Sequence, residues 1–135
     1  MTDFVLDPRL AADSAFIADG PLSQVRLMDD TRFPWLVLVP RVNGVSEWLE
    51  LDGGQQRLLL AEINQAGQLI RAQPGVEKLN IGALGNIVRQ LHVHLTGRHE
   101  GDPAWPGPVW GHGAAVRHGP AALAAQIDAW RRRLR

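Results

Sequence analysis

The most informative part of this sequence is a short segment in which apolar and polar residues alternate without a break. It reads Gln90-Leu91-His92-Val93-His94-Leu95-Thr96. Successive side chains of an extended strand point to opposite faces, so the pattern predicts a strand whose leucine and valine side chains face the core. The glutamine, both histidines and the threonine then project together from the other face. The segment therefore places His92 and His94 side by side.

Two adjacent imidazoles permit several kinds of chemistry. Residues two apart on one strand face lie roughly 6.5–7 Å apart, so both rings can reach one phosphate group or one metal ion. Imidazole titrates near neutral pH, which lets one ring attack as a neutral nucleophile while the other donates a proton. The pair alone leaves three interpretations open: a catalytic pair, a metal site, and a polar solvated face, the commonest of the three. Candidates for a third metal ligand are His99, His112 and His118, although surface histidines are the default.

The flanking sequence predicts an α+β fold. Alternation from Leu22 to Met28 indicates one strand, and a continuous apolar run from Trp35 to Val39 indicates a second strand covered on both faces. An apolar stripe over about 52–73 predicts an amphipathic helix. Weaker alternation over 76–82 indicates a further strand. Apolar residues at helical spacing after Pro120, followed by an arginine run, predict a C-terminal helix.

The composition is that of a globular domain and narrows the possible partners. The chain has 135 residues, of which 45% are hydrophobic and 21% charged, which predicts a single domain over 1–135. Basic and acidic residues both number 14, so no positive field favours duplex nucleic acid. The sequence has no cysteine, no apolar run near the roughly 20 residues of a membrane span, and no secretory signal pattern at its start. We therefore expect a cytoplasmic protein that binds neither duplex nucleic acid nor membrane.

The histidine segment lies within a longer motif. Residues 86–98 resemble the signature of the histidine triad superfamily, in which three histidines alternate with apolar residues and a glycine or proline and an arginine follow. The closing Gly97-Arg98 fixes the register, so that His94 takes the third triad position, His92 the central one and Gln90 the first. This chain therefore departs from the family at its opening histidine.

The resemblance covers roughly residues 22 to 98. The two early strands look like the paired strands that precede the family's helix, but Trp35 stands where many members have a further histidine. Residues 80–86 look like the family's strand and glycine-bearing turn, where polar side chains and backbone contact phosphate. The run at 102–111 is similar to a bacterial branch that commonly has Gln-Leu-His-Val-His in place of the full triad.

The resemblance implies a fold and a reaction. The fold is an antiparallel sheet of about five strands with one long helix and a C-terminal helix. The reaction is nucleotidyl transfer, in which His92 attacks an α-phosphorus and forms a nucleotidyl-histidine intermediate that water or another acceptor resolves. His94 is then expected to contact the phosphate and assist the leaving group.

Four further residues are implied as contacts to the nucleotide or its phosphate. Asn86 and Asn80 come from the turn and the strand ahead of the triad, and Asn86 is expected to donate to phosphate oxygens. Gln90 can still form hydrogen bonds where a histidine is absent, but it cannot carry a proton. Asp29 matches a position that accepts from ribose hydroxyls, with an ordinary surface-turn aspartate as the alternative.

Prolines and glycines between residues 97 and 120 predict a long loop that carries two tryptophans. Trp105 and Trp110 could pack over the site, join a subunit contact or stack on a base, and packing in the core or at an interface is favoured. Their position in a loop leaves these alternatives open.

Two functions from different classes remain after this reading. The first is a nucleotide hydrolase or nucleotidyl transferase that acts on a nucleoside 5′-phosphoryl compound, such as a dinucleoside polyphosphate or a phosphoramidate. The second is a nucleotide-binding protein with little or no catalysis, because Gln90 and Trp35 replace histidines. A metal site on His92 and His94 is a third, less favoured possibility. No cofactor is expected, and the resemblance implies a homodimer.

Overall fold

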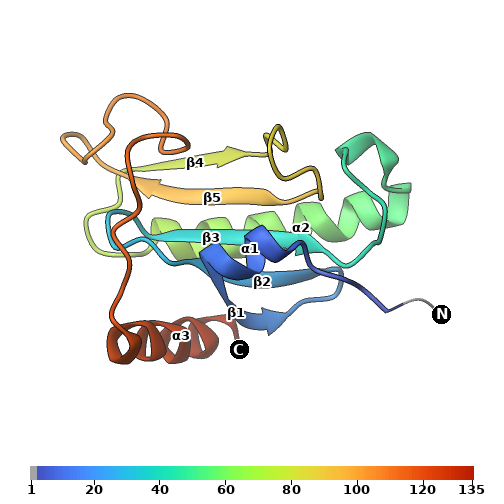
Figure 1. Cartoon of the computed structure of the whole chain (residues 1–135), viewed down its shortest axis with the longest axis horizontal. Helices are drawn as coiled ribbons and strands as arrows, with labels where there is room; N and C mark the ends of the chain where they lie inside the picture. The colour runs from blue at the N-terminus through green and yellow to red at the C-terminus, as the bar shows by residue number, and fades with distance from the viewer. Residues whose placement is uncertain (1–2) are drawn as a thin grey trace.

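A five-stranded antiparallel sheet forms the centre of the molecule in this computed structural model, which describes residues 3–135 (Figure 1). The sheet has the spatial order β1-β2-β3-β5-β4, and each neighbouring pair is antiparallel. The strands are β1 (Ser14–Asp19), β2 (Ser23–Met28), β3 (Trp35–Pro40), β4 (Lys78–Gly82) and β5 (Val93–Arg98). The expected α+β architecture is confirmed, and β3 lies at the middle of the sheet as predicted.

Within the described residues, three α-helices and one short 3₁₀ helix accompany the sheet. They are α1 (Pro8–Asp13), η1 (Trp48–Glu50), α2 (Gly53–Arg71) and α3 (Pro120–Leu134). The long helix α2 begins after Asp52, whose carboxylate accepts from the Gln55 backbone N–H while the Gln55 side chain accepts from that of Asp52. This reciprocal pair satisfies two amides that have no partner inside the helix. None of the helices within residues 3–135 has the length and apolar character needed to cross a bilayer.

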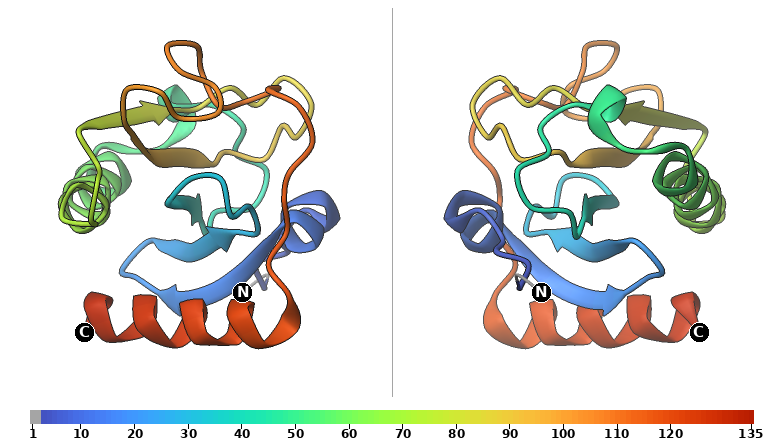
Figure 2. Two further views of the ribbon diagram at one scale, coloured as in Figure 1. Left: turned by 90° about the vertical axis from the view of Figure 1, so that its left-hand side faces the viewer. Right: turned by 90° about the vertical axis from the view of Figure 1, so that its right-hand side faces the viewer.

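The two faces of the sheet are covered by different parts of the chain (Figure 2). Helix α2 lies on one face, where Leu59, Ile70 and Leu95 are fully buried in the larger core cluster. On the opposite face, α1 and the loop after β5 cover a second cluster that includes Trp35 and Val109. Strands β3 and β5 are therefore buried on both sides.

Strand β5 is displaced from its predicted limits. The alternating pattern predicts a strand from Gln90, but regular pairing begins at Val93 and continues to Arg98. The neighbouring strands account for this shift, because pairing with β3 starts at Val93 and pairing with β4 starts at His94. Leu91 instead donates its backbone N–H to the Val45 carbonyl. His92 thus directly precedes strand β5, and His94 lies within it.

Helix α3 closes the sheet at its β1 end (Figure 1). Its Trp130 is buried in the larger core cluster, and Arg131 donates from Nε to the carbonyl of Ile17 at 2.8 Å. The long loop over 99–119 runs from β5, on the far side of the sheet, to this helix. The predicted loop is confirmed, and its course places it across the face that carries the histidines.

Candidate active site

The rings of His92 and His94 form a contacting pair on the face opposite α2. Their centroids are 4.8 Å apart and the ring planes meet at 74°. Only 7% of His92 and 9% of His94 is exposed, because the N-terminal segment and the loop after β5 cover this face. The sequence-based prediction that the two imidazoles share one face is confirmed by this geometry.

The hydrogen bond of His92 defines which of its nitrogens is free. Nδ1 of His92 lies 2.7 Å from the backbone carbonyl oxygen of Gln90. A carbonyl oxygen only accepts, so Nδ1 carries the hydrogen and donates it. Nε2 of a neutral ring then keeps its lone pair, which is the state that a nucleophilic imidazole requires.

His94 has the opposite arrangement. The Nε1–H of Trp35 donates to Nδ1 of His94 at 3.0 Å, so this nitrogen is the acceptor. Burial lowers the pKa of His94 to about 4, and the neighbouring His92 acts in the same direction. Trp110, from the long loop, lies against the same ring with centroids 5.8 Å apart. His94 is therefore held neutral between two indoles.

Gln90 binds the N-terminal segment with its side-chain amide. Its Oε1 accepts from the backbone N–H of Asp7 and its Nε2 donates to the carbonyl of Val5, both at 2.8 Å. Asn43 continues this pattern, because its Oδ1 accepts from the Val5 N–H and its Nδ2 donates to the Asp3 carbonyl. Both polar atoms of the Gln90 side chain are thus already bonded, and its expected contact with phosphate stays a prediction.

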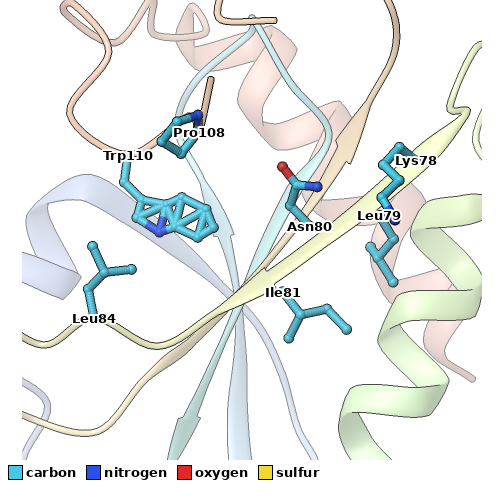
Figure 3. Close-up of a pocket in the computed structure, with 7 residues that line it drawn as sticks. All are labelled: Lys78, Leu79, Asn80, Ile81, Leu84, Pro108 and Trp110. Atoms are coloured by element: carbon cyan, nitrogen blue, oxygen red, sulfur yellow. The ribbon is translucent and has the colours of Figure 1, made fainter. Parts of the chain in front are cut away.

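Asn80 belongs to a polar network beside the histidines. Its Oδ1 accepts from Nη1 of Arg98 at 2.8 Å, and the fully buried Arg98 also forms an ion pair with Asp102. Figure 3 shows Asn80 on β4 together with Pro108 and Trp110 of the loop, which line an open hollow of about 530 Å³. Trp110, which lines this hollow, also lies against the ring of His94.

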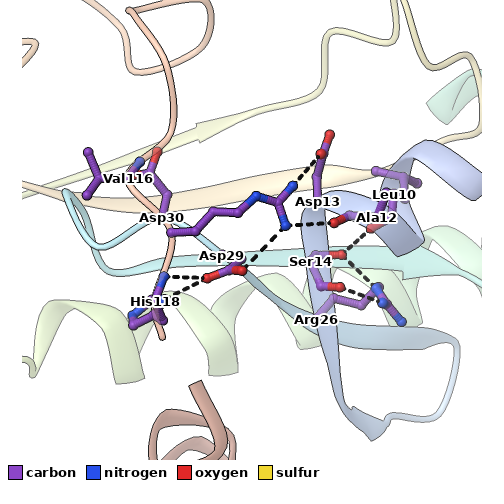
Figure 4. Close-up of polar contacts among 10 residues, drawn as sticks. Leu10, Ala12, Asp13, Ser14, Arg26, Asp29, Asp30, Val116 and His118 are labelled. Carbon is purple, nitrogen blue, oxygen red and sulfur yellow. Dashed lines mark hydrogen bonds and ion pairs between the residues drawn. The ribbon is translucent and has the colours of Figure 1, made fainter. Parts of the chain in front are cut away.

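Asp29 lies at the end of β2 in a second polar network (Figure 4). Its Oδ1 accepts from the backbone N–H and from Nδ1 of His118, and its Oδ2 lies 3.5 Å from Nη1 of Arg117. Burial raises the pKa of Asp29, but the hydrogen bonds from His118 and the charge of Arg117 outweigh burial and hold it below its usual value. With Trp35, Asp29 lines a hollow of about 290 Å³. Contact with a ribose stays a prediction.

The remaining candidate, Asn86, lies in the exposed bend between β4 and β5. The same connection contributes Gly85 to a small cavity of about 90 Å³ that His92 also lines. The structure therefore brings His94 into contact with both His92 and Trp35. Asn86, Asn80, Asp29 and Gln90 lie on separate segments, and their contacts with a nucleotide stay predictions.

No sequence pattern indicates that Trp35 and Trp110 contact His94. Trp35 was noted only as a departure from the family motif, although it binds His94 directly. Trp110 is one of the two loop tryptophans whose roles the sequence leaves open, and the structure packs it on His94. Within residues 3–135, no three histidine, aspartate or glutamate side chains lie close enough together to hold one metal ion.

Comparison with known proteins identifies the family to which this fold and sequence belong. The family model of the HIT domain matches residues 9–101, more than half of the chain. The chain belongs to the histidine triad family.

Solved structures of histidine triad proteins resemble this one over nearly their whole length. The protein from Sinorhizobium meliloti 1021 is 46% identical, with a TM-score of 0.89 over 97% of this chain and 94% of that one. Those from Bradyrhizobium japonicum and Marinobacter aquaeolei VT8 are both 41% identical, with TM-scores of 0.93 and 0.94. The first comparison covers 99% of this chain and 100% of that one, and the second 98% and 97%.

A more distant similarity concerns the fold alone. The NitFhit protein of C. elegans shares 14% identity with a TM-score of 0.68, over 88% of this chain and 27% of that one. No curated protein matches the chain.

Proposed function

We propose that this histidine triad protein is a nucleotide hydrolase or nucleotidyl transferase that acts on a nucleoside 5′-phosphoryl compound. The observation that carries the proposal is the pair of contacting imidazoles with opposite hydrogen-bond assignments. Nδ1 of His92 donates to a carbonyl, while Nδ1 of His94 accepts from an indole. One ring thus presents a lone pair at Nε2 and its neighbour presents an N–H, which suits attack on a phosphoryl group.

In the proposed reaction, Nε2 of His92 attacks the α-phosphorus and the bond from phosphorus to the leaving group breaks. The electron pair of that bond goes to the leaving group, and a nucleotidyl-histidine forms. Water or another acceptor then attacks the same phosphorus, the P–Nε2 bond breaks with its electron pair returning to Nε2, and the proton of the acceptor is released to solvent. His92 is then neutral again. The Gln90 carbonyl accepts the Nδ1 hydrogen throughout, and so stabilises the positive charge that develops on the ring.

The surrounding residues are proposed to bind the rest of the substrate. We propose that Asn86, in the exposed bend, donates to phosphate oxygens and that Asn80, whose Oδ1 accepts from Arg98, contributes a second contact to phosphate. Asp29 lines the hollow that reaches Trp35, where ribose hydroxyls would have to compete with the bonds from His118. Any contact from Gln90 to phosphate would require its bonds to the N-terminal segment to open.

The test is turnover of a dinucleoside polyphosphate and of a nucleoside phosphoramidate by the purified protein. We expect cleavage by the wild type and none by His92→Ala, because no other group supplies the attacking lone pair. His99→Ala, at an exposed loop histidine, is the matched control and should retain activity. The proposal fails if the wild type cleaves neither compound or if His92→Ala cleaves them equally well.

A second function is supported by two particular contacts. Gln90 is committed to the N-terminal segment, and Trp35 donates where many family members have a further histidine. A site altered in this way could bind nucleotide with little or no catalysis. Calorimetry with a mononucleotide separates the two functions, since tight binding without turnover supports the second and absence of binding contradicts both.

We also propose that the protein is a homodimer, as the resemblance to its family implies. Strand β4 is an outer strand of the sheet within the described residues, and Ile81 on it is half exposed. Leu84 and Ile87, in the following turn, are also exposed. A second copy would cover this apolar edge, and sedimentation equilibrium measures the subunit number directly. The absence of cysteine is compatible with a cytoplasmic protein.

A further inference from the structure

Trp35 is the group that decides how His94 can act. Its indole Nε1 lies 3.0 Å from Nδ1 of His94, and both side chains are buried. An indole N–H donates and never accepts. The contact is satisfied only when Nδ1 of His94 has no hydrogen, because two N–H groups would otherwise face each other in a site with little access to water.

We propose that Trp35 is a positioning residue that locks His94 in the neutral form with its hydrogen on Nε2, so that the site favours substrates whose leaving group departs without a proton. In this form His94 can donate a hydrogen bond to a phosphoryl or leaving-group oxygen. It cannot transfer a proton, because giving up the Nε2 hydrogen would leave an imidazolate. This inference rests on the proposed function and specifies its substrate class.

The surroundings of His94 support the lock independently. The aromatic rings that pack against it are His92 from the same segment, Trp35 from β3 and Trp110 from the long loop. None of them carries a negative charge that would stabilise a cationic imidazole. Burial accordingly keeps the pKa of His94 far below neutral pH, so the doubly protonated ring that would serve as a general acid is scarce.

Leaving groups differ in what they need from such a site. A phosphate or polyphosphate leaves as a stable anion, so the electron pair of the broken P–O bond requires no proton. An alkylamine leaving from a P–N bond must gain a proton as that bond breaks. With His94 restricted to hydrogen bonding, the structure favours dinucleoside polyphosphates and other acidic leaving groups over phosphoramidates of alkylamines. Positioned proton transfer contributes about 10²–10⁴-fold to rates, which sets the scale of the preference.

The first test measures the hydrogen positions on the ring. In ¹⁵N-labelled protein at neutral pH, two-bond ¹H–¹⁵N correlations of the His94 ring should show a protonated Nε2 and an unprotonated Nδ1. Trp35→Phe keeps an aromatic ring but removes the donor, and should give a mixture of both neutral forms. A hydrogen on Nδ1 of His94 in the wild type overturns the proposal. If the variant does not fold, the wild-type spectrum still decides the question.

The second test compares leaving groups. We expect the wild type to cleave the nitrophenyl ester of adenosine 5′-phosphate at least about 100-fold faster, in kcat/KM, than the alkyl phosphoramidate of the same nucleotide. In Trp35→Phe, where Nδ1 is free to accept a proton, this ratio should shrink. Equal turnover of both substrates by the wild type overturns the preference. Absence of turnover on both substrates defeats the proposed function and the preference together, whereas the NMR result on the lock stands separately.

Discussion

Removal of the Asp102 carboxylate should destabilise the protein more than any exposed substitution. Asp102 is buried and accepts from Nε and Nη2 of Arg98 at 2.7 and 2.9 Å. It also accepts from the backbone N–H groups of His99, Ala104 and Trp105 in the loop that follows β5. Hydrogen bonds from Arg98 hold the pKa of Asp102 well below its usual value, so the carboxylate is charged throughout the neutral range.

Asp102→Ala leaves the fully buried guanidinium of Arg98 without its counter-charge. Breaking a buried ion pair by removing one partner costs about 3–5 kcal/mol. The backbone amides of His99 and Ala104 also lose their acceptor, which acts in the same direction. For a chain of this length, we expect the midpoint of thermal unfolding to fall by roughly 10–20 °C. Differential scanning calorimetry measures the shift, and urea unfolding gives the free energy.

The matched control is Asp128→Ala, at an exposed position of α3, which should change the free energy of unfolding by less than about 0.5 kcal/mol. Asp102→Asn keeps an acceptor for the loop amides but loses the charge, and should fall between the two. A free energy of unfolding for Asp102→Ala within 1 kcal/mol of the wild type would refute the reasoning.

Two further predictions concern the histidine face. Burial lowers the pKa of His94 to about 4, from about 6.5 in the unfolded chain, so the unfolded state binds more protons between these two pH values. The free energy of unfolding should therefore fall by about 3 kcal/mol as the pH drops through this window. Urea unfolding of the wild type and of His94→Asn measures this pH dependence, and an identical dependence in both would contradict the low pKa of His94. In Gly82→Ala, the new Cβ would overlap Cζ2 of Trp110, so the indole must move. We expect the free energy of unfolding to fall by about 1–3 kcal/mol and the tryptophan fluorescence to change. Gly53→Ala, where the new Cβ makes only an ordinary contact, is the control.

Local periodicity predicted the elements that show a regular pattern of burial. The helix α2 and the strand β3 were recognised because their apolar residues recur at the spacing of one helix face or form a strand buried on both sides. Strand β1 was missed for a physical reason. A bulge between Phe16 and Ala18 interrupts its pairing, and its burial repeats every three residues instead of every two.

Only the part of the site that lies on one segment of the chain could be predicted from the sequence. Alternation placed His92 and His94 together, since both belong to one segment. The contact from Trp35 to His94 joins residues 59 apart in the sequence, and that from Asp7 to Gln90 joins residues 83 apart. Such bonds depend on how the sheet and the N-terminal segment meet, and no local pattern encodes them. The resemblance identified Gln90 and Trp35 as the two positions where a histidine of the family is replaced. The structure shows what each of these side chains bonds to.

The hydrogen bonds from Asn43 and Gln90 to the N-terminal segment determine which amino-acid substitutions that segment tolerates. The side-chain amides of Asn43 and Gln90 form these hydrogen bonds only with backbone peptide groups, at residues 3, 5 and 7. The backbone course of this stretch therefore depends on positions 43 and 90, while its Phe4 and Leu6 side chains pack against the second core cluster. Proline in place of Val5 or Asp7 would break one of these hydrogen bonds, because it has no N–H to offer.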